Sequence, residues 1–124
     1  MTARTAREVV ELYNYRVYNE ADLALADELI ADTIVRHDVG STTTLTREQA
    51  VERIAGFLDS VAGVRFSLPI VVDGQDGHVA IVYQADIDHR DGSTSGIASI
   101  EVFRVENGLI TEVWNNSHQK GHWQ

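Results

Sequence analysis

The chain has 124 residues, of which 44% are hydrophobic and none is cysteine, so we expect one folded domain over residues 1–124 without disulfides, thiolate nucleophiles or cysteine-based metal sites. The net charge of −9 disfavours nucleic acids and anionic membranes as partners, because both would repel the protein. The sequence contains neither a signal peptide nor an apolar run near the length of a membrane span, which predicts a cytoplasmic protein.

Three helices are predicted in the first half of the chain. Apolar residues recur with helical spacing over residues 3–18. A second helix is expected from Asp22, whose carboxylate can cap its N-terminus. A third helix starts after Thr46, because Thr46 and Gln49 fit a capping box, and it ends by Gly63.

Strands dominate the second half, where the hydrophobic period changes from 3.6 to two. Alternating apolar residues predict strands over 64–72, 79–87, 94–105 and 109–117, after a short extended segment over 33–37. Pro69 cannot donate to a ladder, so it indicates an edge strand or a bulge. We therefore expect an α+β domain, with helices on one face of a curved, mainly antiparallel sheet.

The dipeptide Asn107-Gly108 predicts a two-residue hairpin turn between the last two of these strands. An ideal hairpin then pairs Glu106 with Leu109 and, further along, Glu101 with Trp114. Glu101 would face the helices in the company of apolar residues. The residues predicted on its face are Ile97, Phe103, Ile110 and Trp114.

The opposite face of the same hairpin is also apolar. The ideal register puts Ile100, Val102 and Val113 there, pointing away from the helices. Because apolar sheet faces of this size are usually covered, we expect a homodimer through this face.

Glu101 is the first candidate for chemistry. A carboxylate on an apolar wall loses hydration, so its pKa rises and it becomes a candidate acid or hydrogen-bond donor. The alternatives are that Glu101 lies on a solvated face, or that it pairs with Arg36 or Arg104.

His37 and Asp38 are the second candidates, because they follow the apolar Ile34-Val35 and precede a glycine turn, as at the mouth of a pocket. Histidine titrates near neutral pH and can act as a base. Alternatively, His37 closes a loop by hydrogen bonding, and Asp38 caps the turn.

The C-terminal tail offers a weaker pattern. His118 and His122 would share a metal only if the tail were helical, but Gly121 intervenes and no third ligand is near. We expect an exposed tail and no metal or organic cofactor.

Four segments, residues 18–23, 29–32, 35–40 and 102–114, resemble one known family. This family is the SnoaL-like polyketide cyclases of the nuclear transport factor 2-like superfamily, which also includes the ketosteroid isomerases. The resemblance implies a cone of three helices and a bent sheet around an apolar pocket, and a homodimer.

The resemblance also implies roles for individual residues. His37 takes the position of the isomerases' general-base aspartate when no gap is placed, and Asp38 takes it with a gap. Glu101 is similar in position to a protonated aspartic acid in the isomerases and to a histidine in the cyclases. The isomerase tyrosine falls at Tyr13 or Asn14.

The last predicted strand departs from the family pattern. A catalytic aspartate of the cyclases and epoxide hydrolases corresponds to Asn115, an amide that cannot act as a base. The ideal register turns Asn115 away from the helices unless a bulge intervenes, whereas Asn116 faces them without one.

These residues predict a cofactor-independent isomerase or cyclase that moves a proton on a small apolar carbonyl compound of polyketide, steroid or terpenoid type. His37 or Asp38 would be the base, and Glu101 would stabilise the enolate. Epoxide hydrolase or dehydratase is the next enzyme class, and a non-catalytic ligand-binding or dimerising protein is the alternative. The residues expected to bind substrate are Tyr13, Phe57, Phe103, Trp114 and Asn116.

Overall fold

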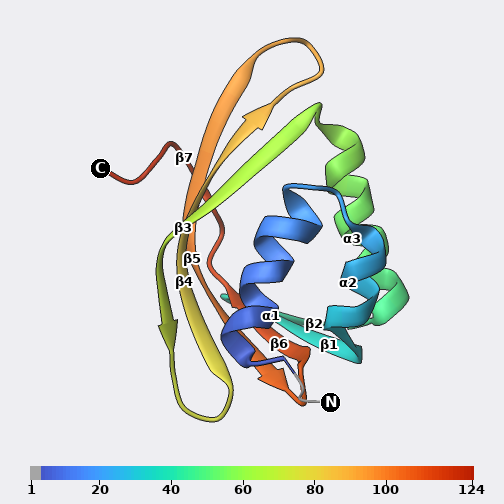
Figure 1. The fold of residues 1–124 in the computed structure, drawn as a ribbon. Helices are drawn as coiled ribbons and strands as arrows, with labels where there is room; N and C mark the ends of the chain where they lie inside the picture. The colour runs from blue at the N-terminus through green and yellow to red at the C-terminus, as the bar shows by residue number, and fades with distance from the viewer. Residues whose placement is uncertain (1–3) are drawn as a thin grey trace.

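A computed structural model describes residues 4–124 (Figure 1). The α-helices are α1 (Ala6–Leu12), α2 (Leu23–Leu29) and α3 (Arg47–Ser60), and a π-helical segment, η1 (Tyr13–Tyr18), continues α1. The strands are β1 (Ile30–Asp38), β2 (Ser41–Thr46), β3 (Gly63–Asp73), β4 (His78–Asp88), β5 (Thr94–Glu106), β6 (Leu109–Asn115) and β7 (Gln119–Lys120).

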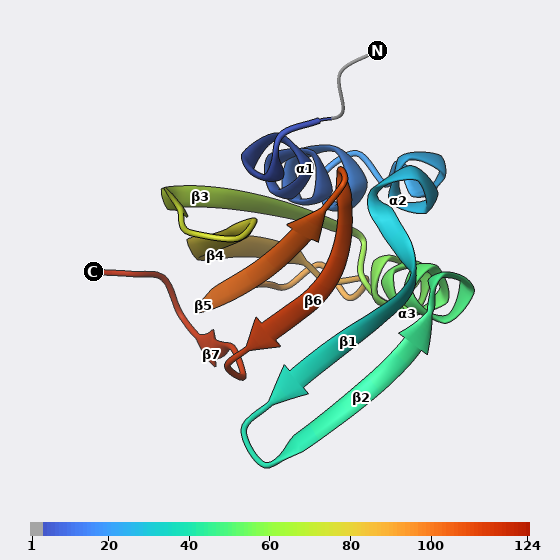
Figure 2. The same cartoon turned by 90° about the horizontal axis from the view of Figure 1, so that it is seen from below.

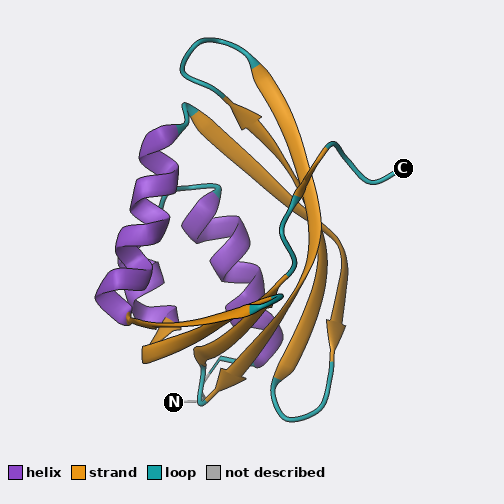
Figure 3. Cartoon of the chain, turned by 180° about the vertical axis from the view of Figure 1, so that it is seen from behind, coloured by secondary structure: helices purple, strands orange, loops and turns teal. Residues whose placement is uncertain are grey.

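One mixed sheet of seven strands curves around the helices. Its order is β2-β1-β6-β5-β4-β3, with β7 paired to β5 (Figure 2). All pairs are antiparallel except β1 with β6. The helices lie on the concave face of the sheet (Figure 3). The predicted α+β architecture, with helices on one face of a curved, mainly antiparallel sheet, is confirmed.

The helix starts follow the predicted capping residues. The Asp22 side chain accepts from the Leu25 backbone N–H, and Thr46 forms the predicted capping box with Gln49. The first helix begins at Ala6, after a second capping box at Thr5. Residue 3, where the predicted helix began, lies outside the described residues.

Thr46→Ala should lower the free energy of unfolding by about 1 kcal/mol, because the variant leaves the Gln49 backbone N–H without its side-chain acceptor. Urea denaturation measures the change. Thr46→Ser retains the hydroxyl and should stay close to wild type; equal losses in both variants would contradict the capping role.

The core fills the space between the helices and the concave face of the sheet. Its side chains come from every large element, so burial ties the two layers together. The largest fully buried side chains are Phe103, Leu29, Ile30, Ile54, Ile81, Ile110, Val9, Val10, Val17, Val79 and Val113.

The π-helical turn of η1 brings two tyrosines onto one face. In an α-helix, residues five apart point about 140° away from each other. A π-helix bonds residue i to i+5, as the Asn19 N–H does to the Asn14 carbonyl at 3.3 Å, so residues five apart come into line. The ring centroids of Tyr13 and Tyr18 lie 5.3 Å apart, while Tyr15 points outward.

Pro69 causes the irregularity that it predicts. β3 is an edge strand, and its pairing with β4 shifts between Ser67 and Ile70. Next to Pro69, the Leu68 backbone N–H donates to a side chain outside the sheet, the Tyr15 hydroxyl, at 3.2 Å.

The C-terminal tail is fixed to the sheet by a side-chain hydrogen bond. The Trp123 indole donates to the backbone carbonyl of Tyr83 at 2.9 Å.

A second bulge, between β5 and β6, changes the predicted register. The pairs Glu106–Leu109 and Val105–Ile110 are those of an ideal hairpin, but Arg104 then pairs with Glu112. Thr111 is the extra residue, and every later residue of β6 changes face.

The prediction that Glu101 and Trp114 are cross-strand neighbours facing the helices is therefore wrong for Trp114. Glu101 faces the helices as predicted, but it pairs with Asn115. Val113, predicted on the outer face, is fully buried, and Trp114 is 36% exposed. Asn116, predicted to face inward, borders a separate hollow beside the tail.

Strand β2 was not predicted. Its sequence, Ser41–Thr46, is mostly threonine and exposed on both faces, so it shows no apolar alternation. Pairing with β1 after the turn at Gly40 makes it the second edge of the sheet. Within residues 4–124, no helix has the length and apolar character needed to cross a bilayer.

Candidate functional site

A cavity of about 250 Å³ lies between the helices and the sheet. Five of its twelve lining side chains are phenylalanine or tyrosine rings, and charged or amide groups enter from the strands, α3 and η1. The lining residues are Tyr13, Asn14, Tyr18, Arg36, Arg53, Phe57, Phe66, Tyr83, Ile97, Glu101, Asn115 and His118.

Glu101 projects into this cavity from the middle of β5. Burial raises its pKa to about 7, although the charges of Arg36 and Arg53 act in the opposite direction. Within residues 4–124, its carboxyl group makes no ion pair or hydrogen bond, so it is open to a ligand. The alternatives of a solvated face and of a pair with Arg36 or Arg104 are wrong.

Three phenol groups share the wall with Glu101. The Tyr13 and Tyr18 hydroxyl oxygens are 3.5 Å apart. Burial, followed by the influence of Tyr18, raises the pKa of Tyr13 well above its usual range. Burial and the nearby Glu101 charge raise the pKa of Tyr83 as well. Tyr13 and Tyr83 therefore stay protonated at neutral pH and can donate hydrogen bonds.

Two amides complete the polar part of the wall. Asn14 is buried and donates to the Val10 carbonyl at 2.9 Å, which fixes its orientation. Asn115, the cross-strand neighbour of Glu101, has a buried Oδ1 atom without a partner in residues 4–124.

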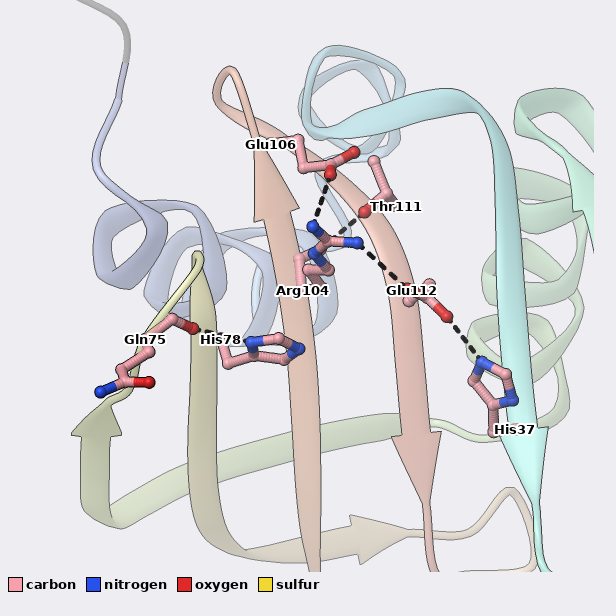
Figure 4. A network of polar contacts seen from close by, with 7 residues as sticks. All are labelled: His37, Gln75, His78, Arg104, Glu106, Thr111 and Glu112. Atoms are coloured by element: carbon pink, nitrogen blue, oxygen red, sulfur yellow. Dashed lines mark hydrogen bonds and ion pairs between the residues drawn. The ribbon is translucent and has the colours of Figure 1, made fainter.

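His37 lies on the other face of the sheet, so the prediction that it shares a pocket with Glu101 is wrong. Its Nε2 atom is 2.8 Å from Glu112 Oε2, and its ring stacks on Trp114 at 4.8 Å. Figure 4 shows this network continuing from Glu112 to Arg104, whose other nitrogen is 3.0 Å from Glu106. Side chains alternate between the two faces of a strand. In β1 Arg36 faces the cavity, so the next residue, His37, faces the other way.

The other predicted site residues divide between cavity, core and surface. Tyr13 and Phe57, which we expected to bind substrate, line the cavity. Phe103 is fully buried in the core, and its ring centroid lies 5.6 Å from that of Tyr13. Asp38 is exposed at the end of β1, and neither it nor Trp114 nor Asn116 lines the cavity.

Several lining residues were missed, although some had a signal in the sequence. Tyr83 belongs to the alternating apolar residues of β4, and Arg36 lies two residues after the buried Ile34. Arg53 lies three residues after Ala50 and four before Phe57, on the predicted apolar face of α3, whereas His118 had no such signal, because the path of the tail brings it to the cavity.

The tail is exposed, as predicted, but it is not free. His118 reaches the cavity, whereas His122 lies 2.8 Å from Asp86 on the outer face. In the part of the chain from residue 4 onward, no group of three His, Asp or Glu side chains is arranged to hold a metal ion.

Comparison with known proteins supports the fold. The family model described as a SnoaL-like domain matches residues 9–113. No curated protein sequence matches the chain.

Solved structures resemble the chain over most of its length. A candidate polyketide cyclase from Acidithiobacillus ferrooxidans has a TM-score of 0.79 and 17% identity, covering 92% of this chain and 88% of its own. A Mycobacterium tuberculosis epoxide hydrolase has a TM-score of 0.75 and 16% identity, covering 90% and 80%. RV0760c from M. tuberculosis, solved with estradiol-17β-hemisuccinate, has a TM-score of 0.75 and 15% identity, covering 90% and 93%. At these identities the likeness shows the fold, which is nuclear transport factor 2-like.

Proposed function

The chain belongs to the SnoaL-like domain family, and from this premise we propose that it is a cofactor-independent proton-transfer enzyme, an isomerase or cyclase, that acts on a small apolar carbonyl compound. The observation that carries the proposal is Glu101, a carboxyl group with a pKa of about 7 in the wall of an aromatic cavity. Such a group is poised to accept and return a proton near neutral pH.

The chemistry needs one group that carries a proton and one that stabilises an oxyanion. Ionised Glu101 removes a proton from the carbon next to the carbonyl, and the electron pair moves onto the carbonyl oxygen. A phenol, Tyr13 or Tyr83, donates a hydrogen bond to the enolate oxygen, since both phenols stay protonated. In an unsaturated ketone, Glu101 then returns the proton to another carbon of the dienolate as the double bond shifts, which completes an isomerisation. In a cyclisation, the enolate carbon attacks a second carbonyl of the substrate, and the alkoxide that forms takes the proton from Glu101.

The substrate class follows from the wall. Phe57, Phe66 and Tyr18 give the cavity an aromatic lining that suits a flat, ring-containing carbonyl compound. The similar proteins described as a polyketide cyclase and as a complex with a steroid derivative support this class.

Deuterium exchange tests the proposal without knowledge of the natural substrate. The probe is 2-tetralone in D2O, whose protons next to the carbonyl are lost and replaced by deuterium when a base removes them. Proton NMR should show faster exchange with the protein than with buffer alone. Exchange at the buffer rate would contradict the proposal.

A non-catalytic ligand-binding protein is the second candidate. Asn115 favours it, because this amide stands where the resemblance to the cyclases implies a catalytic aspartate. A ligand that binds in the cavity while exchange stays at the buffer rate would support this candidate.

We also propose a homodimer through the convex face of the sheet, with a corrected set of residues. The exposed apolar side chains of this face are Ile70 and Val72, each 52% exposed, Ile100, 47% exposed, and Trp114. A second copy covering them would remove this apolar surface from water. Sedimentation at micromolar concentration should show a dimer for the wild type and a monomer for Ile100→Asp. A wild-type monomer would contradict the proposal.

A further inference from the structure

Two arginines of the cavity differ from all the other arginines of the protein. Within residues 4–124, neither Arg36 nor Arg53 makes an ion pair or a hydrogen bond. The arginines that do make such contacts are Arg4, Arg7, Arg16, Arg47, Arg65, Arg90 and Arg104. Both exceptions line the cavity.

The two guanidinium groups approach the cavity from different walls. Arg36 comes from β1 and Arg53 from α3, so they flank the space between sheet and helix. Both influence the pKa of Glu101, but no nitrogen of either lies within 4.0 Å of its oxygens, since the structure has no such ion pair. The carboxyl group therefore does not occupy their hydrogen-bond donors.

The local charge of the cavity is opposite to that of the whole molecule. The chain carries nineteen acidic residues and a net charge of −9, yet Glu101 is the one acidic residue among the described lining residues. Two guanidinium groups exceed this single carboxyl group in charge. A positive cavity in an acidic protein concentrates the electric field at the site and attracts anions.

We propose that the cavity binds its ligand as an anion, a flat apolar molecule with a carboxylate group held between Arg36 and Arg53. This inference rests on the proposed function in that the same cavity is the substrate site. The planar donor fork of arginine matches the two oxygens of a carboxylate, and such charge-assisted hydrogen bonds are the stronger kind. The apolar body of the ligand would then contact Phe57 and Phe66.

The test compares two probes of nearly equal shape, 2-naphthoate and the neutral 2-naphthamide, by isothermal titration calorimetry. The wild type should bind the acid about tenfold more tightly or better, which corresponds to about 1.4 kcal/mol. Arg36→Gln and Arg53→Gln should each reduce this ratio several-fold, because loss of a guanidinium group weakens binding of the acid more than binding of the amide. Arg65→Gln, whose arginine pairs with Asp88 outside the cavity, is the matched control and should retain the ratio.

Equal affinities of the two probes, or no binding of either at millimolar concentration, would overturn this inference. The inference would also be overturned if Arg36→Gln and Arg53→Gln changed the pH dependence of turnover but retained the ratio of the two affinities. The arginines would then act only on the pKa of Glu101. The proposed function fails separately, when the preference for the acid persists but deuterium exchange stays at the buffer rate.

Discussion

Glu101→Gln should lower the rate of protein-catalysed deuterium exchange about 100-fold or more, the usual contribution of a positioned acid or base. The amide has nearly the shape of the carboxylate, but it cannot take up a proton. Binding of the ketone should change far less than turnover, because the aromatic wall is unaltered. In the wild type, exchange should slow as the pH falls below 7, since protonated Glu101 is no longer a base.

Two further variants distinguish the roles that Glu101 can have. If Glu101 only donated a hydrogen bond, Glu101→Gln would retain more activity than Glu101→Leu. If Glu101 carries the proton, both variants should lose activity. His37→Ala should leave the rate and its pH profile unchanged, because His37 lies on the opposite face of the sheet. A slow His37→Ala variant beside a normal Glu101→Gln variant would refute the assignment.

The same carboxyl group should make the stability of the fold depend on pH. Its pKa is about 7 in the folded protein, against an ordinary value of 4.5. Between pH 4.5 and pH 7 the native state binds more protons than the unfolded chain. The stabilisation of the native state by neutral Glu101 is therefore complete below pH 4.5 and is lost as the pH rises through 7. The loss is at most about 3 kcal/mol, because one pKa unit corresponds to about 1.4 kcal/mol.

Urea denaturation of wild type and Glu101→Gln at a series of pH values measures this effect. The difference in the free energy of unfolding between the two should change from pH 4.5 to just above 7 and be flat on either side. Other titrating groups contribute alike to both proteins and cancel. A difference independent of pH would show that Glu101 has an ordinary pKa in the folded state.

Local signals in the sequence predicted most of the fold. Thr46, Asp22 and Pro69 act through neighbouring backbone groups, so their effects on helix starts and on the edge strand could be predicted without tertiary structure. The bulge at Thr111 has no comparable signal. It exchanges the faces of Val113 and Trp114, and the register of an ideal turn cannot anticipate it.

The position of a site residue could be predicted where the alternation of side chains along its own strand determines which face it lies on. Glu101 shares its face with Ile97 and Phe103 whatever the partner strand does, so its position survived the wrong register. The placement of His37 rested on an alignment to the family. A one-residue gap in that alignment changes which face of β1 a residue is assigned to. His118 reaches the cavity from the C-terminal tail, which only tertiary structure brings there.

The π-helical turn of η1 makes part of the cavity wall depend on how many residues the helix contains as well as on which ones. If η1 took α-helical geometry at its present length, Tyr13 and Tyr18 would point about 140° apart and one ring would leave the wall. Loss of one residue between them would instead give a regular α-helix with both rings four residues apart on one face, while Val9 and Val10 keep α1 anchored in the core. Insertions in this short segment, which would change this phase again, therefore offer evolution, or a protein engineer, a route to a differently shaped binding site that leaves the sheet and its chemistry intact.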